Sequence, residues 1–353
     1  MITGRQRIAG RKMGCRSACW DMKSQTFIWC SMTFEIRTLG PDEKITEPGF
    51  YNISLDRHHS QPCDGPSVTS GVLRKMELAT PADVWAFSQL NPDRWVQDDK
   101  TALRLGRAMA AYIEGGMEEV AKHFLVLPED KPRRPTPAQI KAYADGKYTE
   151  AGTRSVEFWA ALDTDPRDQI TDAEQKMIED MGKVLAADPM ASAVMGGIPE
   201  ITMAYQDDQT GLWLLARPDT VNFDGTVTDF KKVNTQGRPF NYRVVDSRIT
   251  EHGYDMQLAF AAEVFEALTG QWPSSAGIIA QWDAKPHHVI LREIAEEDLR
   301  IGQFRNRRAI SRFAECLKSN YWPGPGDDVG AYQRPQWQRD MLLQEMNTEG
   351  TAP

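Results

Sequence analysis

Apolar side chains recur at helical spacing through much of the first half of the chain. Residues 67–92 are interpreted as a capped helix, a break at Pro81 and a second short helix. In residues 101–114 the apolar positions again follow a helical repeat, and the pair Gly115-Gly116 is expected to end that helix. The pattern therefore predicts that this half of the chain is mainly helical.

One stretch interrupts this pattern before it resumes. Residues 128–152 are rich in Pro, Lys and Arg, and we expect a loop or mobile excursion there. At Thr171 the sequence Thr-Asp-Ala-Glu is a capping box, because the Thr171 hydroxyl and the Glu174 carboxylate can each satisfy a backbone N–H group at a helix start. This helix is expected to run to about residue 187.

The second half of the chain changes to the alternation typical of strands. Three runs, at 199–206, 212–223 and 226–233, alternate in this way. Asp224-Gly225 lies between the last two runs, and these residues tolerate the positive φ angles of a tight hairpin turn. The pattern predicts a three-stranded antiparallel meander.

Helices and strands are both expected after the meander. A helix is predicted over 254–268, two strands over 276–283 and 287–294, and a long helix over 296–319. This order favours an α/β fold in which helices flank a central mixed sheet.

The regular pattern begins well inside the chain. Residues 1–48 show no sustained period, and Met32 opens a stretch with fewer cysteines, so residues 1–31 are interpreted as an extension from an upstream start codon. The expected organisation is a poorly ordered leader at 1–48, a single domain at 49–340 with a helical part at 67–190 and a core at 191–318, and a flexible tail at 341–353.

Composition narrows the class of protein. With 41% hydrophobic and 26% charged residues, the 353-residue chain is neither fibrous nor wholly disordered. It has no apolar run of the roughly 18 residues that cross a bilayer and no secretory signal, so no membrane partner is expected. Five cysteines without a disulfide framework indicate a reducing cytoplasm. The net charge of −9 argues against a protein that coats nucleic acid. It does not exclude a nuclease, because carboxylates that bind metal ions also count as negative charge.

The candidate chemistry lies on the predicted meander. Glu200 falls on its first strand, Asp219 at the end of its second, and Asp229 with Lys231 on its third. Side chains alternate along a strand, so Asp229 and Lys231 share a face. Carboxylates buried together need a cation, and hard oxygen ligands favour Mg²⁺ or Mn²⁺. The set favours metal-assisted phosphodiester hydrolysis, with a solvated surface ion pair as the alternative for Asp229 and Lys231.

Several short motifs occur in an order that resembles a known family. They are PEITMAY at 199–205, Arg217-Pro218-Asp219, Thr228-Asp229-Phe230-Lys231, Tyr254-Asp255-Met256-Gln257 and PQW at 335–337. In this order they resemble the RecE-like (exonuclease VIII-type) exodeoxyribonucleases of the PD-(D/E)xK superfamily, over about residues 49–340. The resemblance implies a restriction-endonuclease-like PD-(D/E)xK core.

The resemblance also implies a function. Such enzymes resect double-stranded DNA from its ends with Mg²⁺ during phage-type recombination. They form homo-oligomers and leave a single strand for a single-strand annealing protein. Asp219 and Asp229 would bind metal, with Mn²⁺ as a substitute for Mg²⁺, and Glu200 would bind or position it. Lys231 would be the catalytic lysine, and Gln257 would brace the site.

Two positions depart from the family pattern. The first core helix of the family normally carries a histidine where this chain has Ala110, and related nucleases often have a tyrosine where it has Ala261. Two alternatives therefore stay open beside the exonuclease: a DNA-binding pseudonuclease of the same fold without turnover, and a restriction-type endonuclease.

Basic residues close to the predicted site are candidates for DNA contact. Lys232, Arg238 and Arg243 belong to residues 231–248, a predicted loop next to the site, and are favoured as phosphate contacts. A second cluster lies on the last long helix and comprises Arg305, Arg307, Arg308 and Arg312. For that cluster a solvated charged face is an equal alternative.

Overall fold

The structure is a computed structural model of the whole chain. It describes residues 18–21, 26–29, 35–96, 101–147, 149–222, 224–327 and 330–349. Most of the predicted extension at 1–31, and the last residues of the predicted tail, lie outside this set.

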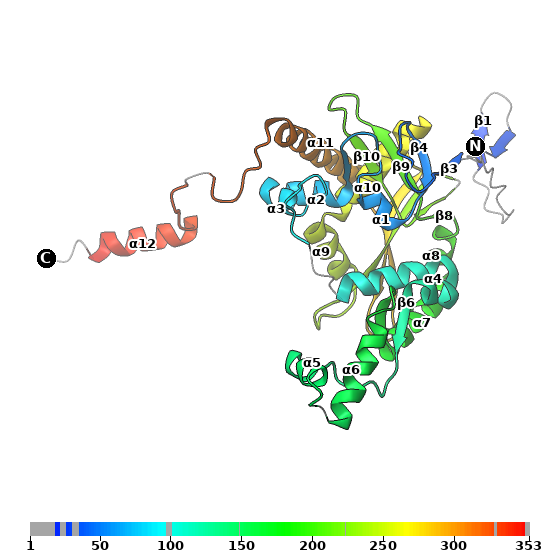
Figure 1. Cartoon of the computed structure of the whole chain (residues 1–353). Coiled ribbons are helices and arrows are strands. Elements are labelled where there is room, and N and C mark those ends of the chain that lie inside the picture. Colours follow the sequence, from blue (N-terminus) through cyan, green and yellow to red (C-terminus); the bar gives the residue numbers. More distant parts are fainter. Residues whose placement is uncertain are drawn as a thin grey trace.

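Two five-stranded mixed sheets form the centre of the protein (Figure 1). The first has the order β3 (Ile36–Thr38), β4 (Gly49–Asn52), β9 (Thr202–Gln206), β10 (Trp213–Ala216) and β5 (Ser67–Thr69). The second has the order β14 (Val289–Glu293), β13 (Ser275–Trp282), β12 (Thr226–Val233), β11 (Thr220–Val221) and β8 (Ile198–Pro199). Two further two-stranded sheets pair β1 (Ala18–Asp21) with β2 (Thr26–Trp29) and β6 (Phe124–Leu127) with β7 (Asp168–Thr171).

The prediction of one continuous meander is wrong. Its first run is split into β8 and β9 at Glu200, which has a φ of 50°. Its second run is split into β10 and β11 after Arg217, where Pro218 has no N–H to donate to a ladder. The chain thus passes between the two sheets twice, and both crossings carry a predicted site residue.

The predicted hairpin turn at Asp224-Gly225 is confirmed. Strands β11 and β12 pair in antiparallel register, with Thr220 opposite Thr228. Gly225 has a φ of 85°, and the Asp224 carboxylate accepts a hydrogen bond of 2.9 Å from the backbone N–H of Thr226.

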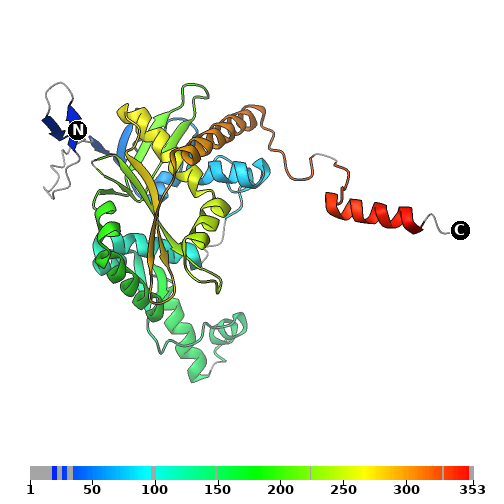
Figure 2. The same ribbon diagram turned by 180° about the vertical axis from the view of Figure 1, so that it is seen from behind.

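Helices cover the sheets on both sides, which confirms the expected α/β class. Helix α10 (Tyr254–Thr269) packs on strands of both sheets, and α2 (Ser70–Leu78) and α11 (Glu296–Ser319) pack on α10. Helices α4 (Thr101–His123), α7 (Asp172–Ala187) and α8 (Pro189–Val194) cover the second sheet, where Phe230 and Ile279 pack into their apolar cluster. Figure 2 shows the long strands running from one helical layer to the other.

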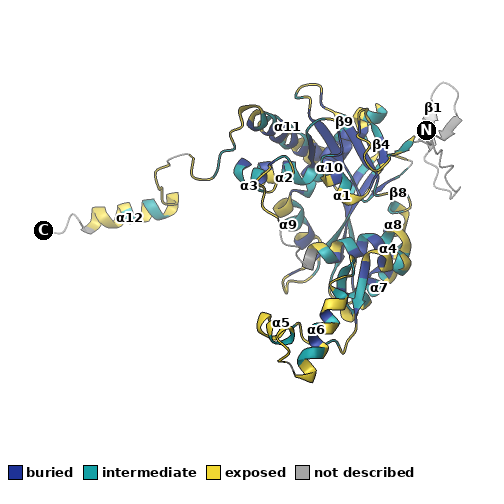
Figure 3. Ribbon diagram, viewed as in Figure 1, coloured by how far each residue is buried: buried dark blue, intermediate teal, exposed yellow. Residues whose placement is uncertain are grey.

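The remaining helices are shorter or peripheral. They are α1 (Leu55–His59), α3 (Pro81–Ala86), α5 (Pro137–Ala144), α6 (Glu150–Leu162), α9 (Tyr242–His252) and α12 (Gln336–Glu349). Figure 3 shows that buried residues concentrate in the strands and α10, whereas α5 and α12 are mostly exposed. The structure contains no helix, among the residues it describes, with the length and apolar character of a bilayer span.

Several helix predictions are confirmed. Helices α10 and α11 occupy the predicted segments, and α7 begins with the predicted capping box. The Thr171 hydroxyl accepts a hydrogen bond of 3.2 Å from the Glu174 N–H, and the Glu174 carboxylate accepts one of 2.7 Å from the Thr171 N–H. Helix α4 is interrupted, as predicted, at Gly115 and Gly116, which leave helical geometry.

The prediction of a loop over 128–152 is wrong, because it missed local capping signals. Helix α5 starts with a capping box between Thr136 and Gln139 and has Pro137 in its first turn, where proline needs no partner for its nitrogen. Helix α6 is capped by the hydroxyl of Thr149.

Residues 35–48 also differ from the expectation of poor order. Strand β3 pairs with β4, and Ile45 is fully buried beside Cys63. These contacts come from residues distant in sequence, which a search for local periodicity does not detect.

Candidate active site

A cleft of about 670 Å³ opens where the two sheets meet. Its lining includes every residue predicted for the catalytic set: Glu200, Asp219, Asp229, Lys231 and Gln257. Helices α1, α2, α4, α9 and α10 contribute its walls. The two chain crossings between the sheets therefore bring residues from separate strands to one place.

Asp219 and Asp229 both line the cleft. Asp229 lies on β12 and is 2% exposed, and its carboxylate forms an ion pair with the Lys231 ammonium. The other Asp229 oxygen, Oδ1, accepts a hydrogen bond of 3.1 Å from Nε2 of Gln257 on α10. Asp219 Oδ2 accepts one of 2.5 Å from the backbone N–H of Phe230. Each carboxylate is thus held by a rigid strand or helix.

The charges of Asp219, Asp229 and Lys231 act on one another. Burial, followed by the negative charge of Asp229, raises the pKa of Asp219 well above its ordinary value. Burial alone would lower the pKa of Lys231, but the charges of Asp229 and Asp219 outweigh it and raise this pKa. Two carboxylates therefore repel each other around a single ammonium.

The oxygen donors of this cleft fit a hard divalent cation. Mg²⁺ is usually bound by one or two carboxylates, together with waters and substrate phosphates, and Asp219 and Asp229 offer that set. The amide oxygen of Gln257 is buried without a hydrogen-bond partner beside them. Among the described residues there is no group of three His, Cys, Asp or Glu side chains arranged to hold a metal ion.

Glu200 is paired with an arginine that the sequence prediction did not assign. Arg217 Nε donates a hydrogen bond of 2.7 Å to Glu200 Oε2. Arg217 Nη1 also donates to the Ile53 carbonyl at 2.7 Å and to the Thr202 hydroxyl at 3.1 Å. Burial raises the pKa of Glu200 while Arg217 opposes the rise. Glu200 is therefore held at the cleft edge by Arg217, the first residue of the Arg-Pro-Asp motif.

Two other cleft residues were also missed. The Lys231 ammonium lies 4.9 Å from the ring centroid of Tyr254, which begins α10 and the Tyr-Asp-Met-Gln motif but had no predicted role. Arg74 of α2 lines the same cleft and donates a hydrogen bond of 3.0 Å to the His252 carbonyl. The sequence around Arg74 carries no signal of this role.

Helix α4 forms the opposite wall. Gly106, Ala110, Ile113 and Glu114 line the cleft at helical spacing. Ala110, the position of the missing histidine, thus shares the cleft with Asp219 and Asp229. Ala261, the second departure from the family pattern, is buried on α10.

The predicted DNA contacts lie at different distances from this cleft. Lys232 lines it and pairs with Asp283 at 3.7 Å. Arg238 and Arg243 are not part of its lining. Arg238 donates a hydrogen bond of 3.4 Å to the Thr235 carbonyl, and Arg243 is exposed. The predicted loop is wrong at both ends, because Lys232 belongs to β12 and Asn241 caps α9, which begins at Tyr242.

Three arginines of the α11 cluster have protein partners. Arg305 pairs with Glu77 and Asp255, and Arg307 pairs with Asp207 and Glu263. Arg308 also pairs with Glu77. This favours a structural role for that cluster over contact with DNA.

The fold and the cleft together define a protein of nuclease architecture. Residues 75–334 match the family described as PDDEXK-like domain of unknown function (DUF3799), and the chain belongs to this family. No curated protein matches the sequence.

Solved structures are similar at low identity. The crystal structure of a candidate exonuclease from Eubacterium rectale is 13% identical, with a TM-score of 0.54, and the similarity covers 82% of this chain and 98% of that one. A phage-related exonuclease from Haemophilus somnus is also 13% identical, with a TM-score of 0.28 and coverage of 60% and 94%. Together with the family match, the similarity to the Eubacterium rectale structure confirms the expected restriction-endonuclease-like fold of the PD-(D/E)xK superfamily.

Proposed function

We propose that this protein is a Mg²⁺-dependent exodeoxyribonuclease of the RecE type, which resects double-stranded DNA ends for phage-type recombination. The observation that carries the proposal is the meeting of Asp219, Asp229 and Lys231 in one cleft of a PD-(D/E)xK fold. The carboxylates of Asp219 and Asp229 suit a divalent cation and, through it, a phosphodiester substrate.

Each residue of the cleft has a separate role in this proposal. Asp219 and Asp229 would hold the cation, which supplies Lewis acidity and a more acidic bound water when present. Lys231 keeps its proton, since its pKa is raised, and contributes positive charge next to the reacting phosphate. Gln257 fixes the orientation of Asp229 through its amide, and Arg217 holds Glu200 at the cleft edge.

DNA and protein partners belong to the same proposal. Lys232 lies in the cleft and would contact the phosphate nearest the site, while Arg238 and Arg243 would contact the duplex further away. A homo-oligomer and a single-strand annealing protein are proposed as partners, in the cytoplasm of a bacterial or phage-infected cell.

A pseudonuclease is the second candidate, favoured by one observation. Ala110 lines the cleft where the RecE-like pattern has a histidine, and alanine can bind neither metal nor phosphate. Such a protein would bind DNA without cutting it.

One digestion experiment tests these readings. The full-length protein is incubated with linear duplex and with covalently closed circular duplex, with Mg²⁺ and with Mn²⁺. Loss of the linear DNA alone is expected for the exonuclease. Cutting of both would indicate an endonuclease, and binding without loss of either would indicate the pseudonuclease.

A further inference from the structure

A second cavity, of about 440 Å³, lies next to the candidate active site between α2 and α3. It shares four lining residues with the cleft: His58, His59, Thr69 and Gly71. A molecule bound in the cleft can therefore continue into this cavity without leaving the protein surface.

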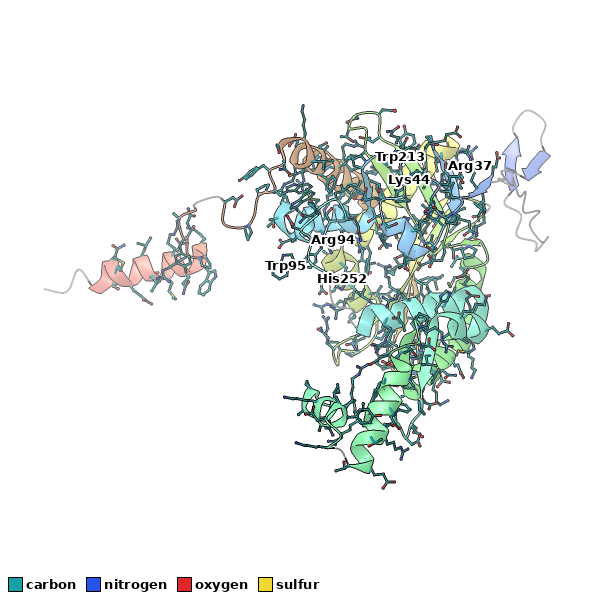
Figure 4. All side chains as sticks on the ribbon, in the orientation of Figure 1. Arg37, Lys44, Arg94, Trp95, Trp213 and His252 are labelled. Atoms are coloured by element: carbon teal, nitrogen blue, oxygen red, sulfur yellow. The ribbon has the colours of Figure 1, made fainter. Side chains whose placement is uncertain are left out.

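Large aromatic side chains are exposed at this cavity. Trp95 is 74% exposed and Phe87 is 42% exposed, although both line it. The backbone N–H of Trp95 donates a hydrogen bond of 2.8 Å to the Ala86 carbonyl, so the backbone is fixed at the end of α3 while the indole faces solvent. Figure 4 shows Trp95 and Arg94 together at the outer edge of the body. An exposed indole on a fixed backbone is a surface on which a flat ring can stack.

The charged residues that line this cavity are basic among those the structure describes. They are Lys75 and Arg94, both exposed, and no carboxylate of a described residue joins them. Lys75 lies 5.9 Å from the ring centroid of Phe87. Burial lowers the pKa of His58 and of His59, so neither imidazole is expected to carry charge at neutral pH. In a chain of net charge −9, a cavity with this lining favours an anionic ligand with flat apolar faces.

We propose that this cavity binds single-stranded DNA, with bases stacked on Trp95 and Phe87 and phosphates paired with Lys75 and Arg94. Aromatic platforms combined with basic residues are how proteins bind single strands without sequence preference. The proposal rests on the proposed function, because the single strand would come from a duplex end that is processed in the adjoining cleft. The strand bound in the cavity would be one that enters or leaves that cleft.

Binding of a short fluorescein-labelled thymidine oligonucleotide to the full-length protein tests this, by fluorescence anisotropy in EDTA so that no cutting occurs. Trp95→Ala is expected to weaken binding by about 5- to 100-fold, as expected for the loss of a base stack, and Trp95→Phe should retain most of the affinity. Trp337→Ala is the matched control, because Trp337 is also exposed, at 69%, but lies on α12 and lines neither cavity. It should bind like the natural protein.

An oligonucleotide with abasic sites separates stacking from general charge attraction. It should bind more weakly than the thymidine strand and should abolish the difference between Trp95→Ala and the natural protein. Equal binding by Trp95→Ala, an equal loss in Trp337→Ala, or no binding of the single strand by the natural protein would each overturn the assignment. Because the assay needs no hydrolysis, a protein that fails to degrade DNA but binds in this Trp95-dependent way would refute the nuclease and keep this site.

Discussion

Helix α10 carries two charge networks, one on the cleft and one under α11, and they are built differently. Under α11, Arg305 and Arg307 each meet two carboxylates, of which Asp255 and Glu263 come from α10. On the cleft side, Gln257 of α10 supports Asp229, and a single ammonium, Lys231, faces the two aspartates. The network under α11 gives Arg305 and Arg307 two carboxylates each, whereas the cleft places Asp219 and Asp229 close enough to repel each other.

The difference separates a structural network from a candidate site. Pairing at α11 ties α10 and α11 to α2 and to the first sheet without any ligand, since Glu77 and Asp207 belong to those regions. The cleft instead raises the pKa of Asp219 by burial and by the charge of Asp229. Strongly perturbed groups in a cleft are typical of functional sites, whereas paired networks are typical of helix packing.

The largest effect is expected when one basic residue in each network is replaced by alanine. Lys231→Ala should lower Mg²⁺-dependent DNA degradation by at least about 10²- to 10³-fold, because it removes the positive charge beside the reacting phosphate. The matched variant Arg307→Ala should instead lower stability by about 1 to 3 kcal/mol, since two carboxylates lose their partner, while the folded protein keeps its activity.

Degradation rates and thermal melting of both proteins measure this contrast. Near-normal degradation by Lys231→Ala would show that the assigned centre is wrong. A loss of activity in folded Arg307→Ala would remove the distinction between the two networks.

A second prediction adds a side chain to the cleft wall. Ala110→His should lower the Mg²⁺ concentration for half-maximal activity by about 10- to 100-fold, the usual effect of a supporting contact at a metal site. Ala138→His on exposed α5, which lines no part of the cleft, is the control and should change nothing. Metal titrations of activity measure this concentration. If it is unchanged in Ala110→His, residue 110 does not act on the site. Inactivity of both proteins at every metal concentration would favour the pseudonuclease.

A smaller effect is expected for the basic residues outside both networks. Reversing charge in Arg238→Glu and Arg243→Glu should reduce the slope of DNA affinity against salt concentration by about one for each lost phosphate contact. Arg300→Glu is the control, because Arg300 is 72% exposed on α11, away from the cleft. Affinity measured over a range of salt gives the slopes, and an unchanged slope would exclude these two arginines from the interface.

The smallest effect concerns stability without metal. The pKa of Asp219 is raised in the folded protein, so the unfolded chain releases this proton near its ordinary value of 3.8 while the folded chain keeps it to higher pH. Stability of the metal-free protein should therefore fall as pH rises from 3.8 through the raised pKa. Asp219→Asn should remove this loss.

Melting temperatures in EDTA across this pH range test the sign. The advantage of Asp219→Asn over the natural protein, a few degrees at most, should grow with pH and disappear when Mg²⁺ is added. Asp42→Asn, at an exposed position, should show no such trend. An advantage that is constant with pH would contradict repulsion in the cleft.

Local patterns in the sequence determined most of the elements and the centre of the candidate site. Alternation on β12 places Asp229 and Lys231 on one face, and the Asp224-Gly225 turn follows from residues that tolerate positive φ. The capping box at Thr171 and the apolar stripes of α10 and α11 are equally local. These features depend on residues within a few positions of one another, so a single sequence is enough to predict them.

Only the tertiary structure decided how the meander is divided and which charges meet. The break at Glu200 depends on a backbone φ of 50° and on the ion pair with Arg217, and the pairing of Arg305 with Glu77 spans 228 positions. Contacts of this kind leave no periodicity in the sequence, because each partner is an ordinary charged residue in its own segment. Their assignment therefore required the packed arrangement of both sheets and α10.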